Sequence, residues 1–162
     1  MLKAHNIKAG VISWDGKHKK DTLFILKENY EKHINIEDIY VLIKRFTAKD
    51  DKKRLVSAVY EPFYNKDVIG FDNKINYIGR KEGNFDFTEA SGLSAVLNST
   101  FMDKYFRCFS GNTQVNATEV RIMKFPKREA IINIGKDIIK TLELELEQYV
   151  IDKIVEKHLW RK

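Results

Sequence analysis

The chain has 162 residues, of which 43% are hydrophobic and 32% charged, and it contains only eight glycines and two prolines. This composition suits one folded unit with a buried core and excludes a low-complexity or disordered chain. With 29 basic and 23 acidic side chains the net charge is +6, and the single cysteine, Cys108, excludes an internal disulfide framework.

The positive charge is unevenly distributed along the chain. Residues 1–128 hold 23 basic and 16 acidic side chains, whereas residues 129–162 hold 6 and 7. A basic excess favours a polyanionic partner, because bound lysine and arginine release counterions from a phosphate backbone. A solvated surface has the same composition, so charge alone leaves both interpretations open.

Nothing in the sequence points to a membrane. No apolar run approaches the roughly 18 residues that span a bilayer, and the N-terminal segment MLKAHNIKAG lacks the apolar stretch of a signal peptide. We therefore expect a cytoplasmic location, no membrane partner and reducing conditions for the cysteine.

The first 80 residues contain short runs rich in β-branched and aromatic residues, which predict strands. Charged segments separate the runs, and Asp72-Asn73 favours a turn between the last two. We expect the first two runs to pair with each other around DGKHKK. The predicted strands are residues 11–14, 21–26, 39–46, 54–63, 68–71 and 74–79.

From Thr88 onward the apolar residues recur at intervals of three and four, which predicts an amphipathic helix with an aromatic end. We expect Thr88 to cap this helix, Asn98-Ser99 to divide it in two, and Gly111 to end it. Cys108 is predicted to be a small buried helix residue rather than a nucleophile.

The segment EVRIMKF, residues 119–125, predicts a strand that Pro126 ends. Residues 127–162 carry an apolar stripe at helical spacing, which predicts one long helix or two helices broken near Thr141. Together these elements predict an α+β fold, with a mixed or antiparallel sheet, a packed aromatic helix and a C-terminal helical segment.

The usual catalytic motifs do not occur in this sequence. Gly135-Lys136 is not a phosphate loop, because the required earlier glycine falls at Ala130 and Asp137 stands where magnesium needs Ser or Thr. The histidines are isolated from one another and from Cys108, so no metal-ligand spacing is present. They are His5, His18, His33 and His158.

A metal-dependent nuclease is one alternative function. Asp67, Asp72 and Lys74, with Glu61 upstream, imitate the acid and lysine set with which many nucleases hold a metal and orient water. The Asp72-Asn73 pair equally suits a plain β-turn.

Five cations surround one predicted hairpin loop, within reach of successive phosphates on a duplex. Lysines also protect a solvated hairpin tip from edge pairing, which is the structural alternative. Strand alternation places Lys44 on the face of Leu42 and Phe46, with Arg45 opposite. The five cations are Lys44, Arg45, Lys52, Lys53 and Arg54.

The segment GNTQVNATEV, residues 111–120, holds more hydrogen-bonding side chains than a turn requires. Asn112, Gln114 or Asn116 can pair in two-point fashion with the edge of adenine, or contact phosphate oxygens. The same amides can instead satisfy the backbone of the loop itself. The residues alone leave this question open.

Two longer segments resemble a known family. IYVLIKRFTAKDDKKRLVSAVY and LSAVLNSTFMDKYFRCFSGNTQVNATEVRIMKFP are similar to the C-terminal target-recognition region of bacterial adenine-specific DNA methyltransferases of restriction-modification systems, the Eco57I and PaeR7I-like group. The aromatic helix followed by GNTQVNAT is the most specific part, and the order of the flanking segments extends the resemblance over nearly the whole chain. Lys53 stands where the family more often has a second arginine.

The resemblance implies a parent enzyme that transfers a methyl group from S-adenosylmethionine to adenine after turning the base out of the duplex. The Asn-Pro-Pro-Tyr motif and the glycine-rich cofactor loop of such enzymes are absent here. The implied partners are therefore double-stranded DNA and a missing catalytic methyltransferase domain, with no cofactor and no catalysis in this chain. Residues 1–126 would form the DNA target-recognition domain, and residues 127–162 a helical appendage packed on the same unit.

The resemblance also implies a set of site residues. The five hairpin cations are expected to contact phosphates or bases, and a second group is expected near DNA: Asn112, Thr113, Gln114, Asn116 and Arg121. The segment 111–118 could equally seat the domain against the catalytic half, because a feature shared by enzymes with different targets cannot read the target. Sequence readout is then expected from residues 10–85. The remaining alternative is a protein-interaction module that docks another subunit through the helices from Lys127 onward.

Overall fold

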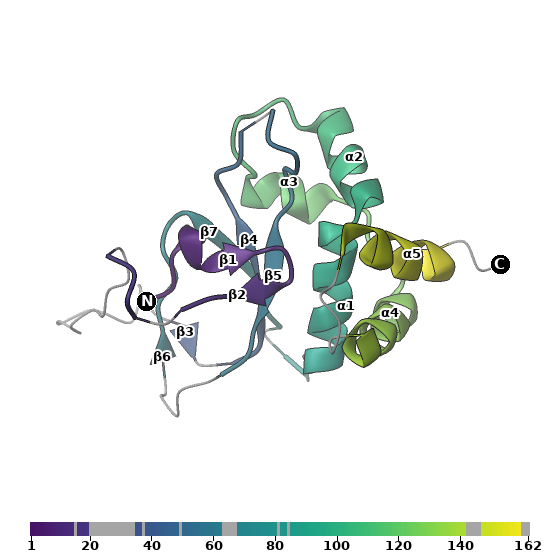
Figure 1. Cartoon of the computed structure of the whole chain (residues 1–162), viewed down its shortest axis with the longest axis horizontal. Coiled ribbons are helices and arrows are strands. Elements are labelled where there is room, and N and C mark those ends of the chain that lie inside the picture. The colour runs from purple at the N-terminus through teal and green to yellow at the C-terminus, as the bar shows by residue number, and fades with distance from the viewer. Residues whose placement is uncertain are drawn as a thin grey trace.

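The computed structural model describes residues 1–14, 16–19, 35–36, 38–48, 50–62, 68–80, 82–83, 85–141 and 147–159. Within these residues, short antiparallel sheets lie on one side of the molecule and α-helices on the other (Figure 1). The predicted α+β fold class is confirmed. The strand predicted at 21–26, together with Asp67 and His33, lies outside the described residues.

The central sheet places β4 (Tyr40–Lys44) between β5 (Ser57–Tyr60) and β7 (Ile75–Ile78), both antiparallel to it. Leu42 in the middle of β4 pairs with Ala58 of β5 and with Tyr77 of β7. All three strands lie within segments predicted to be strands. The turn predicted at Asp72-Asn73 is also present, because the Ile75 N–H donates to the Asp72 carbonyl at 2.9 Å.

Two smaller antiparallel sheets pair β1 (Ile7–Lys8) with β2 (Val11–Ile12), and β3 (Asn35–Ile36) with β6 (Val68–Ile69). The sequence predicted strands at β2 and β6. It missed the tight β1–β2 hairpin, in which Gly10 adopts a φ of +79° that favours glycine. A short 3-10 helix, η1 (Ala4–Asn6), precedes this hairpin.

Strand β4 is buried on both of its faces. Successive side chains of a strand point to opposite sides, and Val41, Leu42 and Ile43 are all buried. Val41 and Ile43 belong to a core shared with the helices. Leu42 belongs to a second core, with Leu2 and Ile7 from the N-terminal segment. The alternation predicted for β4 is therefore present in the packing.

Helices α1 (Phe87–Asn98) and α2 (Thr100–Phe109) confirm the predicted break at Asn98-Ser99. The side chain of Ser99 accepts a hydrogen bond from the first turn of α2 and caps it. Asp86 caps α1 in the same way, so the cap predicted at Thr88 was wrong by two residues.

The end of α2 differs from the prediction in two respects. Ser110 is the C-cap, with its N–H donating to the Phe106 carbonyl at 3.0 Å, and Gly111 follows it. Gly111 does not have the positive φ of a capping glycine, so the glycine cap predicted there was wrong. Cys108 is exposed, so its predicted burial was also wrong. Met102 and Phe106 form the buried face of α2, and Cys108 is rotated about 200° from Phe106 around the helix axis.

Helix α3 (Ala117–Ile122) occupies much of the segment predicted as a strand at 119–125, so that prediction was wrong. Glu119 accepts a hydrogen bond from the Asn116 N–H at 3.0 Å, which satisfies a backbone donor at the start of the helix. Asn-x-x-Glu is a capping pattern. Here it outweighs the strand preference of the β-branched residues that follow.

The C-terminal part forms α4 (Arg128–Thr141) and α5 (Gln148–Leu159), which confirms two helices separated near Thr141. Helix α4 packs against α1, and its apolar stripe is buried in that contact through Ile131, Ile134 and Ile138. The face that a protein-interaction module would offer to another subunit is thus used within the chain.

Candidate nucleic-acid interface

The tip of the β4–β5 hairpin and the loop before α3 lie at the upper end of the molecule in Figure 1. The turn before β7 is joined to the start of the hairpin loop, where the Arg45 N–H donates to the Lys74 carbonyl at 3.0 Å. The Val115 N–H donates to the Arg45 carbonyl, and the Asn76 side-chain amide donates to the Val115 carbonyl, both at 2.7 Å. Phe46 and Gln114 form an isolated antiparallel bridge. We call this assembly the hairpin–loop surface; it comprises residues 44–48, 50–54, 72–76 and 111–122. The two groups of residues expected to contact DNA therefore lie side by side.

Glu119 holds the loop together through three hydrogen bonds. Its carboxylate accepts hydrogen bonds from Ser110 Oγ at 3.0 Å, Asn112 Nδ2 at 2.9 Å and the Asn116 N–H at 3.0 Å. Burial opposes ionisation of this carboxyl, but the three donors outweigh it and lower the pKa of Glu119. The Asn112 amide thus serves the loop itself, as the structural interpretation of the amides predicted.

Arg54 lies inside the fold although the sequence placed it in a basic run. It is only 2% exposed, and its guanidinium donates to the Asn112 carbonyl at 2.9 Å and to Thr47 Oγ1 at 3.2 Å. Its Cζ also lies 5.7 Å from the centre of the Phe106 ring. Because a phosphate cannot reach a buried guanidinium without displacing these contacts, we assign Arg54 a structural role.

The carboxylate of Asp103 fixes the chain at the start of the segment leading to β5. It accepts hydrogen bonds from the Arg54 and Leu55 N–H groups, at 2.7 and 2.9 Å, and from Arg107 Nε at 2.7 Å. Burial opposes ionisation of Asp103, yet these hydrogen bonds prevail and lower its pKa. The hairpin is therefore fastened to α2 from within.

Lys53 also points into the protein. Its ammonium donates to the Asn98 carbonyl at the break between α1 and α2. The same carbonyl accepts from Gln148 Nε2 of α5 at 3.0 Å. Burial lowers the pKa of Lys53, an effect that Asp152 and Asp103 oppose. Lys53 thus links the hairpin to the helices.

The other site residues are accessible on the hairpin–loop surface. Lys52 and Arg121 are exposed, and Lys44 and Arg45 are half-buried. The Arg45 guanidinium donates to the Asn73 carbonyl at 3.3 Å. Among the loop residues, Asn112 and Thr113 are exposed, whereas Gln114 and Asn116 are half-buried.

Sequence reasoning missed three residues that shape this surface. Glu119 had a usable signal, the capping pattern with Asn116. Asn76 had none, because a lone asparagine in a strand says nothing of a distant loop. Phe46 was placed on a strand face, but its exposure of 47% in the structure was not foreseen.

Of the residues named for the nuclease alternative, Asp67 lies outside the described part of the chain, and the alternative stays a hypothesis. Asp72 lies in a turn, where its N–H donates to the Leu2 carbonyl at 2.9 Å. Within the described part of the chain, no three His, Cys, Asp or Glu side chains lie close enough to hold a metal ion. His5 and His18 are nevertheless neighbours, with ring centres 4.5 Å apart, so the expectation that the histidines are isolated was wrong for this pair.

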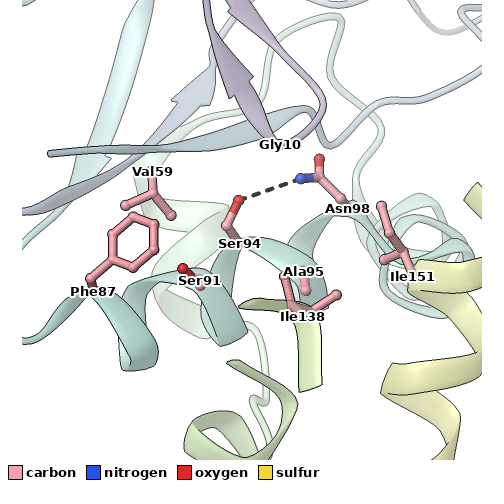
Figure 2. Close-up of a pocket in the computed structure, with 9 residues that line it drawn as sticks. All are labelled: Gly10, Val59, Phe87, Ser91, Ser94, Ala95, Asn98, Ile138 and Ile151. Carbon is pink, nitrogen blue, oxygen red and sulfur yellow. Dashed lines mark hydrogen bonds between the residues drawn. The ribbon is translucent and has the colours of Figure 1, made fainter. Parts of the chain in front are cut away.

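A small cavity of about 90 Å³ lies between the sheet and the helices (Figure 2). The Asn98 amide lies beside it, with Nδ2 donating to the Ser57 carbonyl at 2.8 Å and, more weakly, to Ser94 Oγ at 3.4 Å. Its oxygen accepts from the Ser57 N–H at 2.9 Å. Pockets for drug-sized ligands and cofactors measure about 300–1,000 Å³, so this cavity is too small for one. Its lining residues are Gly10, Val59, Phe87, Ser91, Ser94, Ala95, Asn98, Ile138 and Ile151.

Within the described segments, no helix combines the length and the apolar character that crossing a bilayer requires.

Comparison with known proteins finds similarity to a segment of two longer proteins. No family model and no solved structure matches it. It is 42% identical over 142 residues to the Type II methyltransferase M.BsuBI of Bacillus subtilis, covering 87% of this chain and 28% of that protein. It is 42% identical over 145 residues to the Type II methyltransferase M.PstI of Providencia stuartii, covering 88% of this chain and 28% of that protein. The chain thus spans less than a third of the length of these relatives, and the resemblance stated from its sequence is confirmed: it is homologous to a segment of Type II methyltransferases.

Proposed function

We propose that this chain is the DNA target-recognition part of an adenine-specific DNA methyltransferase of a restriction-modification system. The observation that carries the proposal is the 42% identity to Type II methyltransferases over 87% of the chain. In this proposal the parent enzyme acts in the cytoplasm, and a separate catalytic domain binds S-adenosylmethionine. The chain itself binds double-stranded DNA and performs no chemistry.

The hairpin–loop surface is the proposed contact with the DNA backbone. Lys52 and Arg121 are exposed there. The loop before α3 is held in place by hydrogen bonds of Asn112 with the side chains of Glu119 and Arg54. A rigid surface with cations at its rim can bind phosphates without first becoming ordered, which reduces the entropic cost of binding. Lys53 and Arg54 contribute by fixing this surface rather than by touching DNA.

Binding of the chain to duplex DNA at increasing salt concentration tests the proposal. Fluorescence anisotropy with a labelled duplex should show an affinity that falls steeply between about 50 and about 200 mM salt, since phosphate contacts dominate nucleic-acid binding. The double variant Lys52→Gln/Arg121→Gln should reduce the slope of log K against log salt by about two, because each lost phosphate contact removes about 0.9.

A control double variant, Lys136→Gln/Lys153→Gln, removes the same charge from exposed positions on α4 and α5. It should leave the slope nearly unchanged. Absence of duplex binding, or an equal loss in both double variants, would contradict the proposal.

A further inference from the structure

Phe46 follows β4 at the tip of the hairpin, and 47% of it is exposed. A single exposed aromatic side chain is common on protein surfaces. Phe46 is notable because it lies within the cationic part of the hairpin–loop surface. It directly follows Arg45 in the sequence, and its backbone forms an isolated bridge with Gln114. An apolar ring in this position adds little to the binding of phosphates.

The backbone that carries Phe46 is held on both sides. Before it, the Arg45 N–H donates to the Lys74 carbonyl at 3.0 Å, and the Arg45 carbonyl accepts from the Val115 N–H at 2.7 Å. After it, Thr47 Oγ1 donates to the Arg54 carbonyl at 2.9 Å. The ring is thus presented from a fixed backbone, so little conformational entropy is lost when it meets a ligand.

Arg45 also orients the ring. Its guanidinium carbon lies 5.7 Å from the centre of the Phe46 ring, and the guanidinium is anchored to the Asn73 carbonyl at 3.3 Å. This cation occupies one face of the ring through a cation–π contact. The guanidinium thus covers part of the ring, and 47% of the residue is left exposed to a ligand.

We propose that Phe46 is a base-stacking residue, whose exposed ring packs against a nucleobase where the base stack of the bound DNA is opened. This inference rests on the proposed DNA binding. Aromatic side chains among phosphate-binding cations stack on unpaired bases or enter between base pairs as wedges. Both modes use the chemistry that this ring offers, a fixed π-face beside a cation.

Two matched 20-base-pair duplexes test the inference with the chain as it is, one fully paired and one with a single unpaired base at its centre. The chain should bind the second duplex more tightly. In Phe46→Ala the ratio of the two affinities should fall by about tenfold, in line with the cost of removing one base–aromatic stack. Phe46→Trp should keep the preference, because tryptophan offers a larger π-face. The salt slope should be the same in all three proteins, since the ring carries no charge.

Phe101→Ala is the matched control, since Phe101 lies on α2 and is 43% exposed. It should leave the preference intact. If Phe46→Ala binds both duplexes as the unchanged chain and Phe101→Ala do, the ring does not stack on a base. The same conclusion follows if Phe46→Trp loses the preference for the unpaired base as fully as Phe46→Ala. Salt-dependent binding without any effect of Phe46 overturns this inference alone. Absence of duplex binding by the unchanged chain overturns the proposed function as well.

Discussion

Gly92 of α1 and Gly135 of α4 face each other so closely that a Cβ added to Gly92 would lie 2.9 Å from the Gly135 nitrogen. The same Cβ would lie 1.9 Å from the Ile131 carbonyl oxygen, and a Cβ on Gly135 would lie 1.9 Å from that of Thr88. The two helices thus touch backbone to backbone. Gly135, whose neighbours do not form a phosphate loop, thus has a packing role.

We expect Gly92→Ala, and separately Gly135→Ala, to lower the free energy of unfolding by about 1–3 kcal/mol, the usual range for overpacking. The helices must separate to admit the methyl group, and this loss exceeds the roughly 1 kcal/mol by which alanine favours a helix over glycine. Urea denaturation measures the change. Gly111→Ala is the control, because nothing lies within 4 Å of its added Cβ; equal stability of the Gly92 and Gly111 variants would refute the close contact.

Arg54→Gln should destabilise the chain. The substitution removes the guanidinium hydrogen bonds to the Asn112 carbonyl and to Thr47 Oγ1, and a hydrogen bond to a charged group contributes about 1.5–3 kcal/mol. The midpoint of urea denaturation should fall accordingly. Lys52→Gln removes an exposed cation from the same basic run and should leave the midpoint nearly unchanged while weakening DNA binding. If Lys52→Gln lowered the midpoint as much as Arg54→Gln, the structural role assigned to Arg54 would be wrong.

The difference between these two cations shows where sequence reasoning stops. The run from Lys52 to Arg54 indicates a basic segment correctly, but the direction of each side chain depends on partners far along the chain. Arg54 is fixed through Asn112, and Lys53 through Asn98. No local pattern reports these contacts, so the sequence could identify the segment as basic but could not divide it into outward and inward cations.

The fold was predictable where local signals agree with tertiary packing. The central strands follow from their β-branched and aromatic residues, and the division at Asn98-Ser99 coincides with the cap of α2. Helix α3 was missed because the β-branched residues Val120 and Ile122 favour a strand, whereas Glu119 organises the preceding loop into a helix start. A capping pattern deserves more weight than strand propensity over so short a segment.

Asp137 links α4 to α5 in a way that depends on pH. Its carboxylate accepts from Lys157 Nζ at 2.7 Å and lies 2.9 Å from His158 Nε2, and these contacts lower the pKa of Asp137 to about 2. The unfolded value is about 3.9. A carboxyl with a lowered folded pKa stabilises the fold above its unfolded pKa and loses that contribution as pH falls toward the folded pKa.

Asp137→Asn should therefore be less stable than the unchanged chain at pH 7 and pH 5, and the difference should shrink below about pH 4 and vanish near pH 2. Urea unfolding of both proteins across this pH range gives the difference in their free energies of unfolding. The other carboxyls titrate in both proteins, so their contributions cancel in this difference. Glu156→Gln, at an exposed position of α5, is the control and should show a small difference throughout. A pH-independent effect of Asp137→Asn would exclude the ionised link.

Gln114 tests whether the loop before α3 reads bases or serves every target alike. Its backbone bridges to Phe46 and its side chain is half-buried, so Gln114→Ala keeps the bridge and removes only the amide. If this loop serves every target alike, the affinity should fall by one common factor of about 2 to 12, the contribution of one hydrogen bond, on duplexes of every sequence.

A panel of labelled duplexes of different sequence measures this with the chain itself. Asn112→Ala is the control: its amide is bonded to Glu119 at 2.9 Å, so this variant should lower the stability of the loop rather than act on DNA directly. A changed ranking of duplex sequences in Gln114→Ala would show that this amide takes part in base readout. An unchanged ranking with uniformly weaker binding places readout elsewhere, and the segment 10–85 is where we expect it.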